Sequence, residues 1–173
     1  MKGLRKYTIP FTGLKDGKHA FNFVIDDRFF EAFEGSEVKE GLVDAGIDLV
    51  KNPRFIELHF NLKGKVKVMC DRCLDMFDLA VEYSETLYFR FGEESYEQSE
   101  NVIILSPKEY EIELAQYLYE FVHLALPYKR IHPDENGKPG CNQRMIEKLN
   151  ELGIEKKDTD PRWDRLKDIS DKN

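Results

Sequence analysis

Apolar and polar residues alternate through the middle of the chain, and this period of two predicts β-strands. Every second residue from Ile56 to Leu62 is apolar, and the residues between them are polar. Lys63-Gly64 then has the composition of a turn, after which the alternation resumes at 66–70 and again at 79–91. We therefore predict a three-strand meander over about residues 55–91, with Cys70–Cys73 at its second turn.

The remaining apolar residues complete the outline of the fold. Alternation predicts further strands, and spacings of three and four predict helices farther along the chain. The predicted strands cover 19–25, 43–49 and 102–105, and the predicted helices cover 112–125, 145–152 and 163–169. The fold class is therefore α+β: a mainly antiparallel, twisted or barrel-like sheet with one packed helix and a helical C-terminal tail. We place a β-rich core domain in residues 1–127, and the attached loop and short helices in residues 128–173.

Composition narrows the class of protein. The 173 residues suit one domain or one domain with a tail, and a hydrophobic fraction of 41% is enough for a core. The net charge of -7 argues against a protein that coats nucleic acid through bulk electrostatics. The first residues lack an apolar signal core, and no apolar run approaches the length of a membrane span. We expect a reduced, cytoplasmic protein with no membrane partner.

Cys70-Asp71-Arg72-Cys73 is the most informative motif because it holds two of only three cysteines. A Cys-x-x-Cys turn supplies two thiolates at the spacing that zinc requires, and a structural zinc site takes four ligands. Cys141 and His132 are the candidates for the other two ligands. A Cys₃His site made of these residues would order the segment 133–140, which is rich in proline and glycine, and pin it onto the sheet. Zinc is thus the candidate cofactor.

Two other interpretations of the cysteine pair stay open. Cys70 and Cys73 can be small core residues, since Cys70 shares a predicted strand face with Val66 and Val68. A redox pair of the thioredoxin type is disfavoured, because such a pair begins a helix in a βαβ unit and β-strands flank this one. The chain has no glycine-rich phosphate loop and no nucleophile elbow. We therefore predict that it is not an enzyme and has no small-molecule substrate.

Charge is unevenly distributed along this acidic chain. The segment before the cysteine pair is locally basic, with Lys65 and Lys67 on the outward strand face and Arg72 inside the turn. Arginine pairs with phosphate and stacks on bases, so these three residues are candidates for contact with RNA or a partner. Solvated strand faces and a salt bridge from Arg72 to a neighbouring carboxylate are the ordinary alternatives. Residues 92–120 contain eight acids against one base, which suits a basic protein partner.

Several motifs taken together resemble one known family. Val68–Asp75 resembles the Cys-x-Arg-Cys-Leu signature of the YceD-like proteins, also called large ribosomal RNA subunit accumulation proteins. Glu111–Leu114, followed by Glu120–Pro127, resembles the second signature of that family, a helix with an acidic residue and then Leu-Ala-Leu-Pro. The segment from His132 to Cys141, with Asp160-Pro161-Arg162 after it, resembles the C-terminal tail of the family. The order and spacing of these blocks agree over nearly the whole chain.

The resemblance implies a bacterial or organellar cytosolic protein needed for normal accumulation of large-subunit ribosomal RNA, and it implies no known reaction. Some family members carry more cysteines in the tail, whereas this tail has only Cys141, so a metal would need His132 or another non-thiol ligand. The leading hypothesis is a non-enzymatic ribosome-biogenesis factor that acts on large-subunit ribosomal RNA or a pre-ribosomal particle, with ribosomal proteins as further candidate partners. The alternative is a zinc-stabilised protein-interaction module without direct RNA contact.

Overall fold

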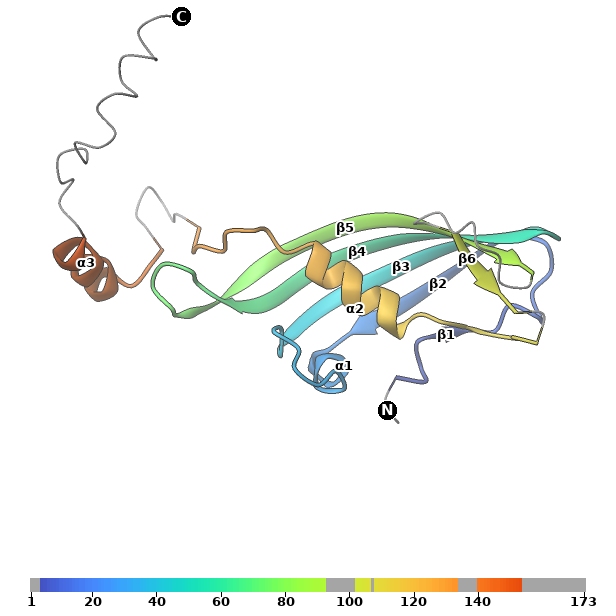
Figure 1. The fold of residues 1–173 in the computed structure, drawn as a ribbon, viewed down its shortest axis with the longest axis horizontal. Coiled ribbons are helices and arrows are strands. Elements are labelled where there is room, and N and C mark those ends of the chain that lie inside the picture. Colours follow the sequence, from blue (N-terminus) through green and yellow to red (C-terminus); the bar gives the residue numbers. More distant parts are fainter. Residues whose placement is uncertain (1–3, 93–101, 107, 134–139, 154–173) are drawn as a thin grey trace, which may run out of the picture. The chain divides into compact units, whose positions relative to one another are not determined.

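The computed structural model describes residues 4–92, 102–106, 108–133 and 140–153. It divides the chain into two compact units, Met1–Ile131 and His132–Asn173. The predicted helix at 163–169 lies outside the described residues. The elements, labelled in Figure 1, are β1 (Thr8–Ile9), β2 (Gly17–Ile25), α1 (Asp27–Glu31), β3 (Gly41–Lys51), β4 (Phe55–Met69), β5 (Met76–Phe91), β6 (Val102–Leu105), β7 (Ile112–Glu113), α2 (Ala115–Leu124) and α3 (Gln143–Leu152).

A five-stranded sheet with the strand order β2-β3-β4-β5-β6 forms the centre of the first unit. The strands β2 to β5 are consecutive in sequence and pair antiparallel, whereas β6 lies parallel to β5. In the described part of the chain β2 and β6 are the two edges, so this sheet is open. The predicted α+β class and the mainly antiparallel sheet are confirmed, and the barrel-like closure is not found among these strands.

The strand β4 runs without a break from Phe55 to Met69, so the turn predicted at Lys63-Gly64 was wrong. Both neighbouring strands pair with β4 through this point. A Cβ atom on Gly64 would lie 2.2 Å from the carbonyl oxygen of Leu42, so glycine here permits a close approach of two strands rather than a change of direction. The predicted three-strand meander is therefore one long hairpin of β4 and β5, with the cysteine pair at its turn.

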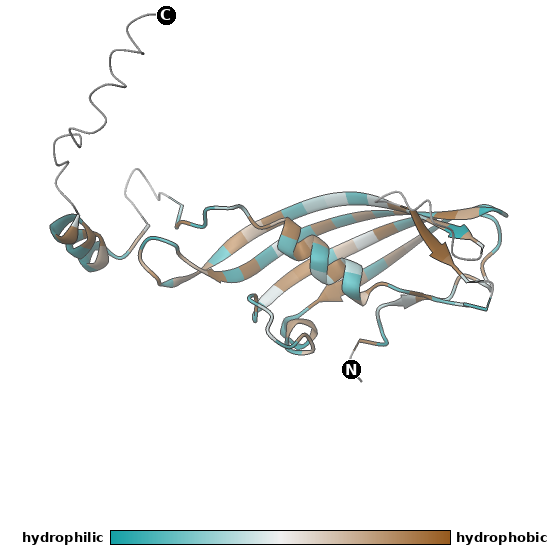
Figure 2. Cartoon of the chain, in the orientation of Figure 1, coloured by the Kyte–Doolittle hydropathy of each residue, from teal (hydrophilic) through white to brown (hydrophobic). Residues whose placement is uncertain are grey.

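One face of the sheet carries the core. Every second residue of β4 from Ile56 to Leu62 is buried, as predicted, and the alternation of hydropathy along the strands is visible in Figure 2. Helix α2 lies along this face (Figure 1) and is the predicted packing helix, but it is shorter than the predicted 112–125 because Ile112 and Glu113 form β7. The ring centroids of Phe60 and Phe121 are 5.1 Å apart, edge to face. The other face of β4 presents polar residues, which include Lys63 and Lys65.

A second, two-stranded sheet joins the N-terminal segment to the segment that precedes α2. The strand β1 pairs antiparallel with β7, so that Thr8 lies opposite Glu113. Beside β1, Tyr7 is buried and its hydroxyl donates a 2.8 Å hydrogen bond to the carbonyl oxygen of Val24 in β2. The N-terminal segment is thus attached both to the edge of the large sheet and to the approach to α2.

The second unit is described over residues 132–133 and 140–153. Helix α3 spans the stretch from Met145 to Leu152, whose apolar spacing predicted a helix, and none of the side chains of α3 is buried. Cys141, two residues before α3, is buried. Neither α3 nor any other described helix has the length and apolar character that crossing a membrane requires.

Candidate metal centre

The turn of the β4–β5 hairpin holds the first two cysteines. The backbone N–H of Cys70 donates to the carbonyl oxygen of Asp75 at 2.9 Å, and the N–H of Leu74 donates back to the carbonyl oxygen of Cys70 at 3.0 Å. The second bond closes a single helical turn, and Leu74 ends it in the left-handed region at a φ of 63°. This turn brings Cys70 and Cys73 together, and both side chains are fully buried.

A pair of hydrogen bonds attaches a distant segment to this turn. The N–H of Asp71 donates to the carbonyl oxygen of Arg130 at 2.8 Å, and the N–H of Arg130 donates to Oδ2 of Asp71 at 2.6 Å. The guanidinium of Arg130 also forms an ion pair with Glu37. Since His132 follows Arg130 by two residues, the chain delivers this histidine close to the cysteine turn.

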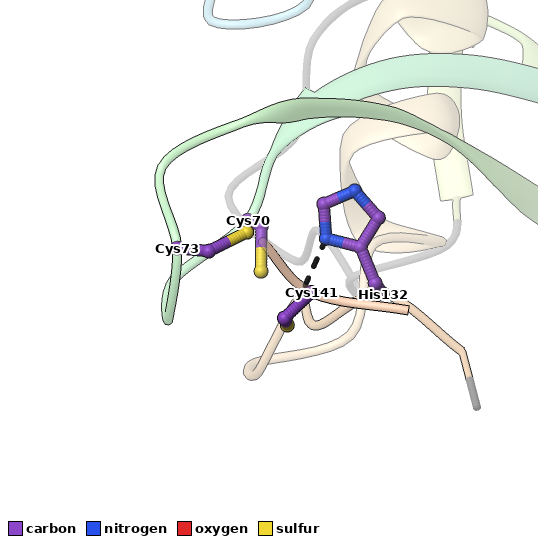
Figure 3. A group of neighbouring side chains, drawn as sticks. All are labelled: Cys70, Cys73, His132 and Cys141. Atoms are coloured by element: carbon purple, nitrogen blue, oxygen red, sulfur yellow. Dashed lines mark hydrogen bonds between the residues drawn. The ribbon is translucent and has the colours of Figure 1, made fainter. Parts of the chain in front are cut away.

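The last two candidate ligands lie beside one another. Nδ1 of His132 is 3.9 Å from Sγ of Cys141, which is drawn as the dashed line in Figure 3. Gly140 permits this approach, because a Cβ atom there would lie 2.4 Å from the carbonyl oxygen of Pro133 and 3.1 Å from Cβ of His132. A larger residue would force the chain before Cys141 away from the histidine.

The four predicted ligands form one group, which we call the Cys₃His cluster (Cys70, Cys73, His132 and Cys141). One ligand atom from each residue lies within 4.8 Å of all the others, and the side chains converge in Figure 3. In a tetrahedral zinc site, bond lengths of about 2.0–2.3 Å place ligand atoms roughly 3.5–3.8 Å apart. The three cysteines are buried and the histidine is half-buried, so water has little access to the group. The cluster could hold a metal ion, and its soft sulfur and imidazole donors suit zinc.

The same geometry bears on the other interpretations of the cysteine pair. A reactive thiol of the thioredoxin type lies at the N-terminus of a helix, where the helix dipole favours the thiolate. Here an antiparallel hairpin surrounds the pair, with β4 ending at Met69 and β5 beginning at Met76. A purely packing role would account for the burial of the cysteines, but it would not account for an imidazole among the three thiols.

The predicted contact residues lie in two different places. Arg72 is half-buried in the cysteine turn, while Lys65 and Lys67 lie on the outer face of β4. Lys67 forms an ion pair with Glu40, and this carboxylate raises the pKa of the lysine above its ordinary value. In the cross-strand register Lys67 also lies opposite Asp78.

The sequence suggested a basic patch at Lys65 and Lys67, but the structure surrounds them with acids. A hollow of about 510 Å³ beside these lysines is also lined by Asp26, Asp27, Glu40 and Asp78. Sequence reasoning missed this because the acids come from other segments, namely the start of α1, the residue before β3, and strand β5, and meet the lysines only in the folded chain. It also missed Gly140 and the link between Asp71 and Arg130, for which the sequence carries no local signal.

One family model matches residues 58–170, and its description is large ribosomal RNA subunit accumulation protein YceD. The matched span begins within β4 and contains the whole Cys₃His cluster together with Arg72. No curated protein and no solved structure matches the chain. Because the matched span covers more than half of the chain, the protein belongs to the YceD family of large ribosomal RNA subunit accumulation proteins.

Proposed function

We propose that this protein is a non-enzymatic, cytosolic factor in ribosome biogenesis, that it supports the accumulation of large-subunit ribosomal RNA, and that its Cys₃His cluster binds zinc. The family description supports the role in accumulation of the RNA. The observation that carries the metal is the convergence of three thiols and one imidazole inside the family-matched span.

The donor set supports a structural metal rather than a catalytic one. Catalytic zinc sites use three protein ligands and keep one position for water or substrate, whereas structural sites use four protein ligands. The four side chains of the cluster would fill every position of a tetrahedron. Zinc would therefore join His132 and Cys141 to the hairpin turn and supply no reaction.

Contact with RNA is the part of the proposal that concerns Arg72, Lys65 and Lys67. Arg72 is the strongest of the three, because it lies within the turn that the metal would make rigid, and a rigid arginine loses less entropy on binding phosphate. Lys67 contributes less positive charge because of its ion pair with Glu40. We expect substitution of Arg72 to weaken RNA contact more than substitution of Lys67.

The alternative function is a zinc-stabilised module that binds proteins without direct RNA contact. The hairpin tip favours it, because Met69, Leu74 and Met76 are all more than half exposed there. Methionine adapts its shape to a partner surface, and apolar side chains grouped at a tip are typical of interaction sites. Pull-down of the protein with and without nuclease separates the two functions, since partners bridged by RNA disappear after digestion.

Metal content is the first prediction. Protein purified without chelator should contain about one zinc per chain, and Cys141→Ser should lower the zinc affinity more than about tenfold, because it removes a ligand. His132→Asn should act in the same direction, while His59→Asn should not, because His59 lies on the outer face of β4 and bonds with Thr86. Elemental analysis and competition with a chelator measure both quantities. Metal-free protein with an unchanged melting curve would leave only a packing role for the cysteines.

The cellular role is tested by deletion of the gene. We expect the deletion strain to contain less large-subunit ribosomal RNA relative to small-subunit ribosomal RNA, and the wild-type gene to restore the ratio. A deletion strain with normal ribosomal RNA levels and normal subunit profiles contradicts the proposed function, whatever the metal content of the protein.

A further inference from the structure

A groove of about 1170 Å³ lies in the first unit, where the N-terminal segment meets the approach to α2. It lies away from the Cys₃His cluster in sequence and shares no residue with it. Its walls include the aromatic residues Phe33, Tyr110 and Tyr117 and the carboxylates Glu111 and Glu113. The pairing of β1 with β7 fixes one wall relative to the other, because Glu113 lies opposite Thr8, which also lines the groove.

The charge of the groove is predominantly negative. Glu111 and Glu113 face a single cation of the lining, Arg5. Among the described residues, neither of these carboxylates forms a salt bridge. The pKa of Tyr117 is raised, first by burial and then by the charges of Glu120 and Glu109, so the negative field extends beyond the lining itself.

The aromatic residues give the groove a second property. Tyr110 is 63% exposed as a residue, although its backbone carbonyl accepts a hydrogen bond from the hydroxyl of Thr12, so an exposed residue has an anchored backbone. Lysine and arginine side chains lie favourably over aromatic rings, and carboxylates beside the rings neutralise the positive charge of these side chains. Aromatic rings beside carboxylates that form no salt bridge suit a cationic peptide chain. The same carboxylates repel the phosphates of a nucleic acid.

The hollow beside Lys65 and Lys67 has a different character. Its four acids lie among three bases, Arg28, Lys65 and Lys67, and Lys67 already forms an ion pair with Glu40, so most of its negative charge is balanced within the protein. A cation from a partner would therefore gain little binding free energy at this hollow. Four acids against three bases and two acids against one base give both linings a formal net charge of −1. The aromatic groove differs in its three aromatic rings and in its two carboxylates, which form no salt bridge with a described residue.

We propose that this groove binds an extended, lysine- and arginine-rich segment of a partner protein. The inference deepens the proposed function and rests on it for the source of the segment, because proteins that bind ribosomal RNA carry such basic segments. The partner would be held at the groove while the RNA-contact residues remain on other surfaces. RNA itself is not the occupant, since its phosphates would meet the same carboxylates.

The test measures binding of a fluorescent peptide of roughly twelve residues that alternates lysine and arginine with glycine and serine. We expect it to bind the full chain, a peptide with glutamate in place of the cations not to bind, and the affinity to fall steeply with added salt. The double variant Glu111→Gln/Glu113→Gln should bind the basic peptide roughly tenfold more weakly. Tyr110→Ala should weaken it as well, which separates the aromatic contribution from charge alone.

The controls match the variants in charge and in exposure. Asp44→Asn/Asp48→Asn removes two carboxylates from the exposed outer face of β3, and Tyr128→Ala removes a fully exposed ring elsewhere. Neither control should change the affinity. Equal losses in the control and groove variants, or wild-type binding no tighter than that of the acidic peptide, would overturn the inference. Melting curves confirm that every variant is folded before it is measured.

The cellular arm separates this inference from the proposed function. If the deletion lowers large-subunit ribosomal RNA and the variant Glu111→Gln/Glu113→Gln restores it fully, the groove is not used and the proposed function stands. If the deletion itself changes nothing, the proposed function fails, and peptide binding in solution alone decides whether the groove is a basic-peptide site. We expect the double variant to restore the RNA only in part.

Discussion

Gly140 controls the distance between the last two ligands of the Cys₃His cluster. The chain folds back so closely there that a side chain would meet the carbonyl oxygen of Pro133 at 2.4 Å. Contacts of that length do not occur in folded proteins, so the backbone would have to move. The movement would carry Cys141 away from His132 without altering any ligand.

A prediction at the residue scale follows from Gly140. The substitution Gly140→Ala should weaken zinc binding roughly tenfold, as the loss of a supporting residue around a metal site commonly does. Gly13→Ala is the matched control, because a Cβ atom there meets no atom within 4 Å. Competition with a chelator measures the affinity. An unchanged affinity in Gly140→Ala would show that the loop is not held in this form when the metal is bound.

Residue types, together with position in one loop, sufficed to predict the members of the cluster. A metal site depends on few chemical groups: the three cysteines are the only thiols of this chain, and among its four histidines His132 is the one in the same loop as Cys141. The supporting contacts could not be predicted in the same way. Asp71 bonds to Arg130 mainly through backbone atoms, which every residue possesses, so the sequence contains no mark of that contact.

At the scale of elements, the length of β4 is the main difference between expectation and structure. A glycine within a strand pattern can mark either a turn or a close approach of two backbones, and the local sequence does not distinguish between them. One signal was present: the even-numbered apolar residues continue in phase from Leu62 to Val66 across Gly64. The predicted helix over α2 was reliable because its apolar spacing extends over several turns.

Gly64 gives a prediction on the stability of the β3–β4 pairing. Gly64→Ala should lower the free energy of unfolding by roughly 1–3 kcal/mol, because Cβ would lie 2.2 Å from Leu42 O and 2.6 Å from Val43 Cα. Gly46→Ala in β3 is the control, since its Cβ would meet its nearest neighbour at 3.7 Å. Urea denaturation compares the two variants. A loss in Gly64→Ala no greater than that in Gly46→Ala would show that the strands are not so close.

On the scale of the whole molecule, three tyrosines make the stability of the fold depend on pH in the alkaline range. Burial is the largest cause of the raised pKa at Tyr7, Tyr83 and Tyr117. These three side chains come from the N-terminal segment, from β5 and from α2, so together they sample most of the first unit. In the unfolded chain each would ionise near its ordinary pKa of about 10.

The sign of the pH effect follows from these shifts. Above about pH 10 the unfolded state releases protons that the folded state still holds, so the free energy of unfolding should fall as the pH rises through the folded pKa values. Tyr117→Phe should make this fall shallower, as measured by urea denaturation between about pH 9 and 11. The pKa of Lys67 is also raised, but its effect on the pH dependence of stability is the same in the wild type and in Tyr117→Phe, so it cancels when the two are compared. Parallel curves for the variant and the wild type would contradict the assignment.

The pairing of β1 with β7 has a consequence for the order of events during synthesis. Residues 8–9 emerge about a hundred residues before their partners at 112–113, which at ribosomal speeds of about 5–20 residues per second is a delay of roughly 5–20 seconds. The β2–β5 hairpins have only local pairings and can form within that interval. The aromatic groove, whose walls come from both ends of this long loop, is therefore completed after these hairpins, once Tyr117 has emerged, and before the Cys₃His cluster, which needs Cys141. A nascent chain that has not yet exposed residues 110–117 cannot capture a basic segment there, although its β2–β5 hairpins are already complete.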